Sequence, residues 1–553
     1  MWTRRNVLQA LGAGAGLVAV PAPIRRALAA AEPDLILRLT ARRDEVSLWP
    51  GARTAVLRYF GQVLHGRTDA LKPSPGYLGP TLELRRGERV RIEFRNGLAE
   101  PSIIHWHGML VPESADGHPR FAVGPGGEYV YEFTVRNPAG TYLYHPHPHG
   151  RTGSQVYRGL AGLLIVREDR ERAYGLPAAE HELSLAIQDR RVDDNQLVFK
   201  RTMMDDMNGV LGDTVLVNGM PDAAFRVTPR PWRLRLANVS NARVYKLAWS
   251  DGRPLSVIGT GNGLLSAGEG IQTRPYVVLG PFERVELLED FGARRPGAEI
   301  ALVSRDFAGV GMMDMMGGGA DGMMDGMMGR GMGGMMGRGM GGMMGPGQGE
   351  ELNLARFAVA AAARSPGETS RLPPAEAPPQ GRHELRTRLA FRHMQGFLNG
   401  RRFEMAAVAG DERLPLGKGT VWTFVNDGGM MAMPHPMHVH GVRFRILERS
   451  GGAPADLGEG LVDAGFKDTV LIFPGETVRL LVAPTEPGLF MYHCHNLEHE
   501  DGGMMRNCLF GPPVRGQDRA RRGSLQQRRN KEMETSTAAS QRTSFAYGSG
   551  RRP

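Results

Sequence analysis

Short segments of alternating apolar and polar residues fill most of this chain and set the strongest limit on its fold. Val90–Phe94 and Tyr129–Val135 are two such segments, and alternation along a β-strand places every second side chain on one face. Gly, Pro, Asn and Asp separate the segments about every 8–12 residues, which is the spacing of turns in β-sandwiches. Long helical periodicity is scarce. The sequence therefore predicts an all-β protein built from β-sandwich domains.

The strand-like sequence divides into three units, at residues 34–168, 175–362 and 382–513. A chain of 553 residues is too long for one ordinary domain, because domains average about 100–200 residues. A linker rich in Pro, Glu and Ala, residues 363–381, precedes the third unit. The polar, aperiodic residues 514–553 predict a disordered tail.

A low-complexity insert interrupts the second unit at residues 312–344. It holds 14 methionines in 33 residues, and its octapeptide at 327–334 is repeated at 335–342. So much glycine disfavours a stable helix, and the insert has too few other apolar residues to build a core. We therefore expect a disordered, Met/Gly-rich segment.

The N-terminus has the features of an export signal. Thr3-Arg4-Arg5 begins a twin-arginine pattern, an apolar stretch follows at Ala10–Val20, and Ala27–Ala29 is a small-x-small cleavage site. The apolar stretch is about half of the ~20 residues that a membrane span needs. The pattern predicts that residues 1–29 are a cleaved twin-arginine signal peptide. We expect a periplasmic or secreted protein, exported folded and without a membrane span after cleavage.

The net charge of +10 comes from the two ends of the chain. Residues 1–29 carry +4 and residues 515–553 carry +7, which leaves −1 for residues 30–514. A nearly neutral body has no electrostatic footprint for nucleic acid. Cys494 and Cys508 are the only two cysteines, so no disulfide framework holds this chain together. Cys508 lies in an apolar final strand and is expected to be a small core residue.

Eleven of the 16 histidines fall in four tight clusters. On a strand, residues i and i+2 point to the same face, so each His-x-His aims two imidazoles at one place. A single such pair is commonly a surface feature, but four pairs bring eight imidazoles together if their strands meet. The clusters are His105-Trp106-His107, His145-Pro146-His147-Pro148-His149, His435-Pro436-Met437-His438-Val439-His440 and His493-Cys494-His495-Asn496-Leu497-Glu498-His499.

The last cluster adds a thiolate to the imidazoles. Cys494 points opposite to its histidine neighbours, so one short strand serves two metal sites, one on each face. Together with His435, His499 and a downstream Met504, Cys494 makes the ligand set of a blue-copper centre, two His and one Cys with a weak axial Met. Imidazole alone would also suit zinc, iron or nickel, but this combination favours copper.

These motifs, in type and order, resemble the three-domain multicopper oxidases, which include bacterial laccases, bilirubin oxidases and copper-efflux cuprous oxidases. The resemblance spans residues 34–512 and implies three cupredoxin-like Greek-key β-sandwiches with four copper ions. By match, His105 and His438 would hold the type 2 copper, and His435, Cys494, His499 and Met504 the type 1 copper. The binuclear type 3 pair would be held by His107, His145, His147, His440, His493 and His495. His149 stays outside this ligand set.

The resemblance also implies a reaction. Electrons from a reducing substrate would arrive one at a time at the type 1 site and pass through Cys494, which is bonded in sequence to His493 and His495. Dioxygen would be reduced to water at the other three coppers. Asp116 and Glu500 match acidic positions that relay protons in similar enzymes, although each would otherwise be an ordinary surface or turn carboxylate.

The identity of the reductant is open between Cu(I) and phenols or aromatic amines. Thioethers select Cu(I), so residues 312–344 and Met433 favour a cuprous oxidase with laccase-like activity, acting in copper tolerance. We expect the protein to be a monomer. Met433 matches a substrate-copper methionine of such enzymes, but Met431 stands where they have Asp. The alternatives are a general laccase or bilirubin oxidase with an incidental insert, a copper-sequestering protein, or a copper-free relative of the fold.

Overall fold

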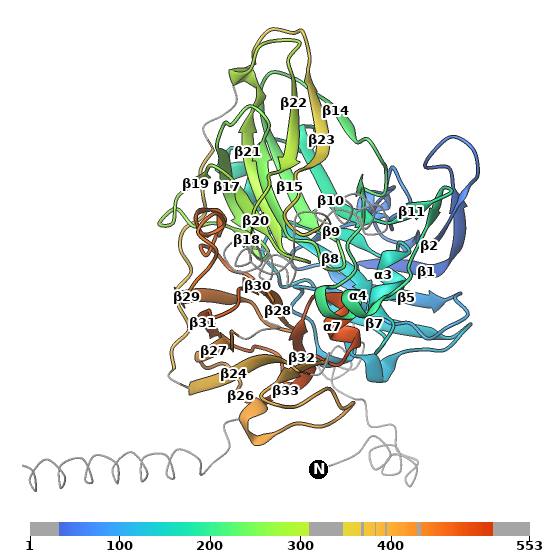
Figure 1. Cartoon of the computed structure of the whole chain (residues 1–553), viewed down its shortest axis with the longest axis vertical. Coiled ribbons are helices and arrows are strands. Elements are labelled where there is room, and N and C mark those ends of the chain that lie inside the picture. The colour runs from blue at the N-terminus through green and yellow to red at the C-terminus, as the bar shows by residue number, and fades with distance from the viewer. Residues whose placement is uncertain are drawn as a thin grey trace, which may run out of the picture.

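The computed structural model describes residues 32–308, 347–365, 370–381, 383–392, 395–428 and 433–511. These residues are mostly β-strands, and most strands fall into three pairs of sheets (Figure 1). The predicted signal peptide, Met/Gly-rich insert and C-terminal tail, as well as Met431, lie outside the described residues.

The first pair of sheets encloses a core of alternating apolar side chains. In β1, Leu35, Leu37, Leu39 and Ala41 are fully buried, while the residues between them are more exposed. One sheet has the order β2-β1-β5-β7 and the other β3-β4-β9-β8-β6. The strands are β1 (Leu35–Val46), β2 (Thr54–His65), β3 (Leu71–Lys72), β4 (Thr81–Arg85), β5 (Arg89–Asn96), β6 (Ile104–His107), β7 (Glu128–Thr134), β8 (Gly140–Pro146) and β9 (Gly162–Arg167).

The second pair of sheets has the orders β13-β10-β15-β21-β17-β18, with β19 beside β17, and β14-β23-β22-β16-β20. β11 and β12 form a separate two-stranded sheet, and Gln196 of β12 accepts a hydrogen bond from the Ala55 N–H of β2 at 3.0 Å. The strands are β10 (Glu182–Arg190), β11 (Val192–Asp193), β12 (Gln196–Leu197), β13 (Thr214–Val217), β14 (Ala224–Val227), β15 (Pro231–Asn238), β16 (Tyr245–Trp249), β17 (Leu255–Thr260), β18 (Gly263–Leu264), β19 (Gln272–Arg274), β20 (Val277–Leu279), β21 (Arg284–Asp290), β22 (Glu299–Ser304) and β23 (Leu352–Val359).

The third pair has the orders β25-β24-β27-β31-β29 and β26-β33-β32-β28-β30. Cys508 is fully buried in its core, as predicted. The strands are β24 (His383–Arg392), β25 (Gln395–Leu398), β26 (Arg413–Pro415), β27 (Thr420–Asn426), β28 (His435–Val439), β29 (Phe444–Ser450), β30 (Thr469–Ile472), β31 (Thr477–Val482), β32 (Gly488–Cys494) and β33 (Met505–Gly511).

Helices are few and short in the described part of the chain. The α-helices are α3 (Thr152–Tyr157), α4 (Met203–Asn208) and α7 (Leu497–Asp501). The 3-10 helices are Thr68–Ala70, Glu113–Ala115, Pro119–Phe121, Asp169–Tyr174, Ala179–His181, Phe291–Ala293, Gly410–Glu412 and Gly458–Gly460. None of the helices described is long and apolar enough to cross a membrane.

The three sandwiches repeat one topology. β1 and β5, β10 and β15, and β24 and β27 are equivalent parallel neighbours. β4 and β9, β14 and β23, and β26 and β33 form a second equivalent set. Parallel neighbours within largely antiparallel sheets require crossing connections, as in Greek keys. The predicted all-β, three-sandwich fold is confirmed, whereas the residue limits of the three units stay predictions.

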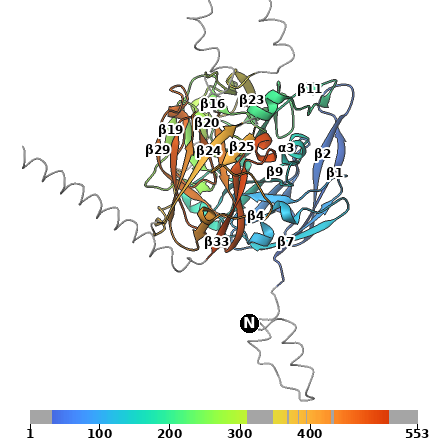
Figure 2. The ribbon, with the colours of Figure 1, turned by 60° about the horizontal axis from the view of Figure 1, so that its bottom comes forward.

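The first and third sandwiches lie side by side, with the second against both (Figures 1 and 2). In this topology, β6 and β8 of the first sandwich are equivalent to β28 and β32 of the third. Those four strands carry the histidine clusters. The equivalent strands of the second sandwich, β16 and β22, contain no histidine.

Candidate metal centres

Strand pairing places the histidine clusters opposite one another. β6 pairs antiparallel with β8, with His105 opposite His145. β28 pairs antiparallel with β32, with His438 opposite His493. Because side chains on directly opposite residues share a face, each sandwich presents four imidazoles, and the two sets of four meet between the first and third sandwiches.

His105 and His438 form the first part of the meeting point. Their Nε2 atoms face each other across 3.3 Å. Each ring is oriented by its other nitrogen, since His105 Nδ1 donates to the Asp116 carbonyl oxygen at 2.6 Å and His438 Nδ1 donates to the Asp468 carbonyl oxygen at 2.8 Å. A histidine that donates from Nδ1 has an unprotonated Nε2, which is the usual arrangement of a metal ligand.

His147, His440 and His493 form the second part. Their donor atoms lie within 4.8 Å of one another. His493 Nε2 lies 3.0 Å from His440 Nε2 and 3.4 Å from His147 Nε2. His440 Nδ1 donates to Asp116 Oδ2 at 2.8 Å, and His493 Nδ1 donates to the Cys494 carbonyl oxygen at 3.1 Å. These hydrogen bonds again point Nε2 lone pairs at a common centre.

His107, His145 and His495 form the third part. His107 Nδ1 lies 3.2 Å from His495 Nε2. His107 is turned this way because its Nε2 donates to Asp468 Oδ1 at 2.9 Å. His145 Nδ1 donates to the Pro146 carbonyl oxygen, and its Nε2 is buried with no hydrogen-bond partner within the described residues. An orphaned buried nitrogen beside two other ring nitrogens is suited to metal coordination.

The electrostatics of the eight imidazoles fit a bound cation. All eight are at most 1% exposed. Burial lowers their pKa values, to about 3 for His145 and to about 4 for His438, so the rings are neutral at pH 7. Neutral imidazole is the form that binds metal. Two unprotonated nitrogens cannot hydrogen-bond to each other, so the pairs that lie 3.0–3.4 Å apart fit a cation bound between them.

A second cluster surrounds Cys494 on the opposite face of β32. Its Sγ lies 3.4 Å from His435 Nδ1 and 3.5 Å from His499 Nδ1. All three side chains are buried, and burial raises the pKa of the thiol. Coordination to a metal would offset this effect, because a coordinating thiol is deprotonated.

Met504 reaches this second cluster through its backbone. Its N–H donates to the His499 carbonyl oxygen at 2.9 Å, and its own carbonyl accepts from the Cys494 N–H at 3.1 Å. The Met504 side chain is fully buried. It packs so closely on Gly396 that a Cβ added there would lie 2.7 Å from the thioether sulfur. The absence of a side chain at Gly396 therefore leaves room for Met504.

The two predicted proton-relay residues adjoin the eight-histidine cluster. Asp116 contacts His105 and His440 as described. Its Oδ1 is buried and has no hydrogen-bond partner within the described residues. Glu500, on α7, lies with Oε2 3.3 Å from His493 Nδ1 and Oε1 3.6 Å from His147 Nε2. Burial raises the pKa of both carboxyls well above its usual range, which favours proton uptake at these positions.

His149 does not join either cluster. Its side chain is exposed, and its ring lies 4.9 Å from the ring of Phe403. This position agrees with the expectation that His149 is not a ligand.

Sequence reasoning did not find the residues that brace the eight-histidine cluster from outside. Fully buried Asp468 accepts hydrogen bonds from Arg284 Nη1 at 2.7 Å and Nη2 at 2.5 Å, in addition to His107. Phe282 stacks on His495 with ring centroids 3.9 Å apart. Phe282 and Arg284 belong to the second sandwich, so that sandwich supports a centre to which it gives no histidine.

Phe282 also has a positive φ of 60°. This left-handed conformation is unfavourable for a bulky side chain and typically persists where surrounding contacts fix it. Here, the Phe282 N–H donates to the Asn238 carbonyl at 2.9 Å, and the Phe282 carbonyl accepts from Arg284 Nη1 at 3.0 Å. No spacing in the sequence signals such a position, because the usual markers are Gly, Asn and Asp.

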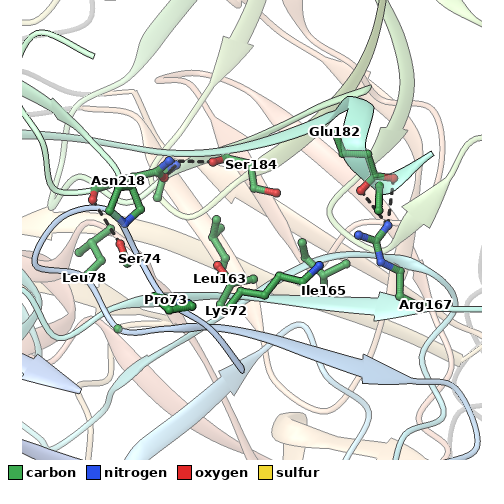
Figure 3. A pocket seen from close by; sticks show the side chains of 15 residues that line it. Lys72, Pro73, Ser74, Leu78, Leu163, Ile165, Arg167, Glu182, Ser184 and Asn218 are labelled. Carbon is green, nitrogen blue, oxygen red and sulfur yellow. Dashed lines mark hydrogen bonds and ion pairs between the residues drawn. The ribbon is translucent and has the colours of Figure 1, made fainter. Parts of the chain in front are cut away.

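A separate cavity of about 250 Å³ lies between the first and second sandwiches (Figure 3). Arg167 and Glu182 are paired at one end of it, at 2.7 Å, and Leu163 and Leu78 line its apolar wall. It contains none of the predicted metal ligands. Its charged groups are paired, Lys72 with Glu83 and Arg167 with Glu182, so it offers no unpaired charge to a ligand.

This chain is similar to several known proteins. Family models described as multicopper oxidase match residues 377–513 and 68–171. The multicopper oxidase mco of Staphylococcus epidermidis is 29% identical over 430 residues, which cover 77% of this chain and 81% of that protein. The cell division protein FtsP of Xenorhabdus nematophila is 30% identical over 454 residues, which cover 79% of this chain and 84% of that protein.

Among solved structures, the McoA multicopper oxidase of Aquifex aeolicus superposes with a TM-score of 0.68. It is 30% identical, and the match covers 87% of this chain and 97% of that one. The chain therefore belongs to the multicopper oxidase family, as the motifs predicted. It is a copper-containing oxidoreductase that uses oxygen as electron acceptor.

Proposed function

We propose that this oxidase binds four copper ions and that its physiological reductant is Cu(I). The type 1 copper would be held by His435, Cys494, His499 and Met504, and the type 2 copper by His105 and His438. The type 3 pair would be held by two trios, His107, His145 and His495 for one ion and His147, His440 and His493 for the other. The converging ring nitrogens and the buried thiol support this assignment.

When bound, the four coppers supply one-electron transfer and the four-electron reduction of O₂ to water. Cys494 links the two clusters, because its peptide bonds join it to His493 and His495 on the other face of the strand. Asp116 and Glu500 would hold and release the protons that water formation consumes. Buried carboxyls with raised pKa values, within 3.6 Å of ligand imidazoles, suit that role.

The observation that favours Cu(I) is where one end of the methionine-rich insert meets the described structure. Gln348, just beyond the insert, donates from Nε2 to the Ala242 carbonyl at 2.8 Å and accepts from the Val244 N–H at 3.1 Å. Gln348 also lines a small cavity together with Met433 and Pro434. Those two residues immediately precede His435 in sequence. Four residues after the insert, the chain therefore lies beside the residues that precede the proposed type 1 ligand His435.

Thioethers near the electron-accepting site would collect Cu(I) in preference to harder cations. Met433 is 3% exposed, so it would bind copper delivered along the insert more readily than copper from bulk solvent. Phenols and aromatic amines would remain secondary substrates, which an insert covering the type 1 site would obstruct.

Steady-state oxygen uptake tests this proposal, with Cu(I) and with a phenol as separate reductants. Deleting residues 312–344 should lower the rate with Cu(I) and leave or raise the rate with the phenol. A second variant keeps the length of the insert but carries serine at all 14 methionine positions. This variant separates the effect of losing the thioethers from the effect of losing the segment itself. It should lose cuprous activity without gaining phenol activity.

The same measurements distinguish the alternatives. Equal rates of Cu(I) oxidation in the wild type, the deletion variant and the serine variant would mean that the insert is an incidental loop. That result would favour a general laccase or bilirubin oxidase. Bound Cu(I) without oxygen uptake would favour copper sequestration, and a protein that takes up no copper would be a copper-free relative.

We further propose export by the twin-arginine route to the periplasm or medium, a monomeric mature protein and a role in copper tolerance. Mass spectrometry of the mature N-terminus, size-exclusion chromatography and growth of a deletion strain on copper test these three points. A mature chain that begins at Met1 in the cytoplasm would contradict the first.

A further inference from the structure

A second methionine segment, outside the insert, lies against His499, one of the proposed type 1 ligands. Residues 203–207 read Met-Met-Asp-Asp-Met and form α4. Three hydrogen bonds join α4 and the residues directly after it to the chain around His499. His499 Nε2 donates to the Met207 carbonyl at 2.7 Å, Asn496 Nδ2 donates to the Asn208 carbonyl at 3.1 Å, and the Val210 N–H donates to Glu498 Oε2 at 2.9 Å.

The start of α4 is fixed as well as its end. The Thr202 hydroxyl accepts from the Asp205 N–H at 3.3 Å, and the Thr202 N–H donates to Asp205 Oδ2 at 2.7 Å, which is a reciprocal cap. Asp205 also pairs with Arg191 at 2.5 Å. This short helix is therefore held in one orientation over His499 despite its length.

The three methionines share one side of α4. At 100° per residue, positions 203, 204 and 207 fall within about 100° of one another, and neighbours three or four apart lie about 5–6 Å from each other at Cβ. Both carboxylates of the segment are engaged elsewhere, since Asp205 pairs with Arg191 and Asp206 pairs with Arg201. The groups left for a ligand are thioethers.

Exposure of these methionines decreases toward the type 1 site. Met203 is 71% exposed, Met204 is half-buried and Met207 is 4% exposed. A large apolar side chain that is mostly exposed carries a cost in water, and the other exposed large apolar side chains among the described residues are only 38–51% exposed. The three methionines therefore lead from solvent to Met207, whose carbonyl accepts the hydrogen bond from His499.

We propose that Met203 and Met204 form a docking site for substrate Cu(I), from which the electron reaches the type 1 site through Met207 and His499. The inference rests on the proposed cuprous oxidase function and adds a fixed site to it, distinct from the insert. Soft thioethers select Cu(I), and unbranched methionine adapts to a cation without a rigid cage.

The redox balance of the site is simple. Each docked Cu(I) gives up one electron and becomes Cu(II), which thioethers hold weakly, so it leaves and the site is free again. Four such electrons, with four protons, reduce one O₂ to two molecules of water in the reaction of the family.

The test is the double variant Met203→Leu/Met204→Leu in the full-length copper-loaded enzyme. Leucine keeps the volume and apolar character of methionine but has no sulfur. The KM for Cu(I) should rise about tenfold, which corresponds to the loss of about 1.4 kcal/mol of binding. The kinetics with a phenol and the blue absorption should stay at wild-type values. Anaerobic competition against a chromogenic Cu(I) chelator should show one fewer site.

Met405→Leu is the matched control, because Met405 is an exposed methionine of the third sandwich, 42% exposed, outside α4. An unchanged KM for Cu(I) in the double variant, with cuprous activity lost on deletion of the insert, would overturn the α4 site and leave the proposed function standing. A wild-type enzyme that does not oxidise Cu(I) would overturn both. A parallel loss of phenol activity would make α4 a structural support only.

Discussion

Replacing Asp468 with asparagine should weaken both the fold and copper binding, by separable amounts. The carboxylate is fully buried and accepts from Arg284, Asn262, Thr469 and His107. Asparagine offers one acceptor oxygen and an NH₂ group that faces those donors. It also leaves the buried Arg284 guanidinium without a counter-ion, and breaking one side of a buried ion pair costs about 3–5 kcal/mol.

This loss should lower the melting temperature by about 6–20 °C, at about 2–4 °C per kcal/mol for a unit of this size. It stays below the typical total stability of about 5–15 kcal/mol, so the variant should still fold. Loss of the hydrogen bond that orients His107 should reduce copper affinity about 10–100-fold, the usual effect of removing a partner of a metal-bound histidine.

Calorimetry and chelator competition measure the two effects. Asp463→Asn is the control, because Asp463 pairs with Arg449 at 3.0 Å but its side chain is 34% exposed. In the double variant Arg284→Met/Asp468→Asn, stability should partly return, since no buried charge is left unpaired, while copper affinity should stay low. Unchanged melting and affinity in Asp468→Asn would refute the reasoning.

Three further predictions follow from the sites. Cys494→Ser should abolish the blue absorption and turnover and remove one copper of four, as metal analysis and visible spectra would report. Asp116→Asn should slow oxygen reduction about 10²–10⁴-fold and leave anaerobic reduction of the type 1 copper intact in stopped-flow measurements. Burial opposes ionisation of Glu182, but Arg235 and Arg233 outweigh it and lower its pKa from 4.5 to about 2. Glu182→Gln should therefore cost about 3 kcal/mol at pH 7, and the difference from wild type should shrink as pH falls from 4.5 toward 2.

Each of these predictions has a clear contrary result. A blue Cys494→Ser protein, or one that contains zinc, would contradict the ligand assignment. Wild-type turnover in Asp116→Asn across pH would make Asp116 structural. Glu180→Gln is the control for Glu182, because Glu180 is 71% exposed. A Glu182 effect that grows in acid would show that the sign of the linkage is wrong.

The sequence was sufficient to predict which histidines of a cluster share a face, because the two-residue period of a strand fixes their side. His105 and His107 share a face, and the same rule turns Cys494 away from His493 and toward a second site. The alternation of Val90–Phe94 likewise predicted a buried face, since Val90, Ile92 and Phe94 are buried. These inferences need only local geometry, which the sequence carries directly.

The surroundings of the cluster could not be read in this way. Asp468 and Arg284 are 184 residues apart and lie in different sandwiches, so no local spacing connects them. A phenylalanine with positive φ, Phe282, has no sequence signature. The six parallel strand pairs of the described residues could not be predicted either, since alternation shows which face of a strand is buried but not which strand is its neighbour.

The division of the eight histidines between two sandwiches has a consequence for assembly. His107 and His495 are separated by 388 positions, so copper held between them would act as a cross-link that closes a very long loop. Long loops are where a clip restricts the unfolded chain most. Neither sandwich could retain the proposed three-copper centre alone, so copper content would report on correct docking of the two sandwiches. Chelation should loosen the contact between the first and third sandwiches before either core melts.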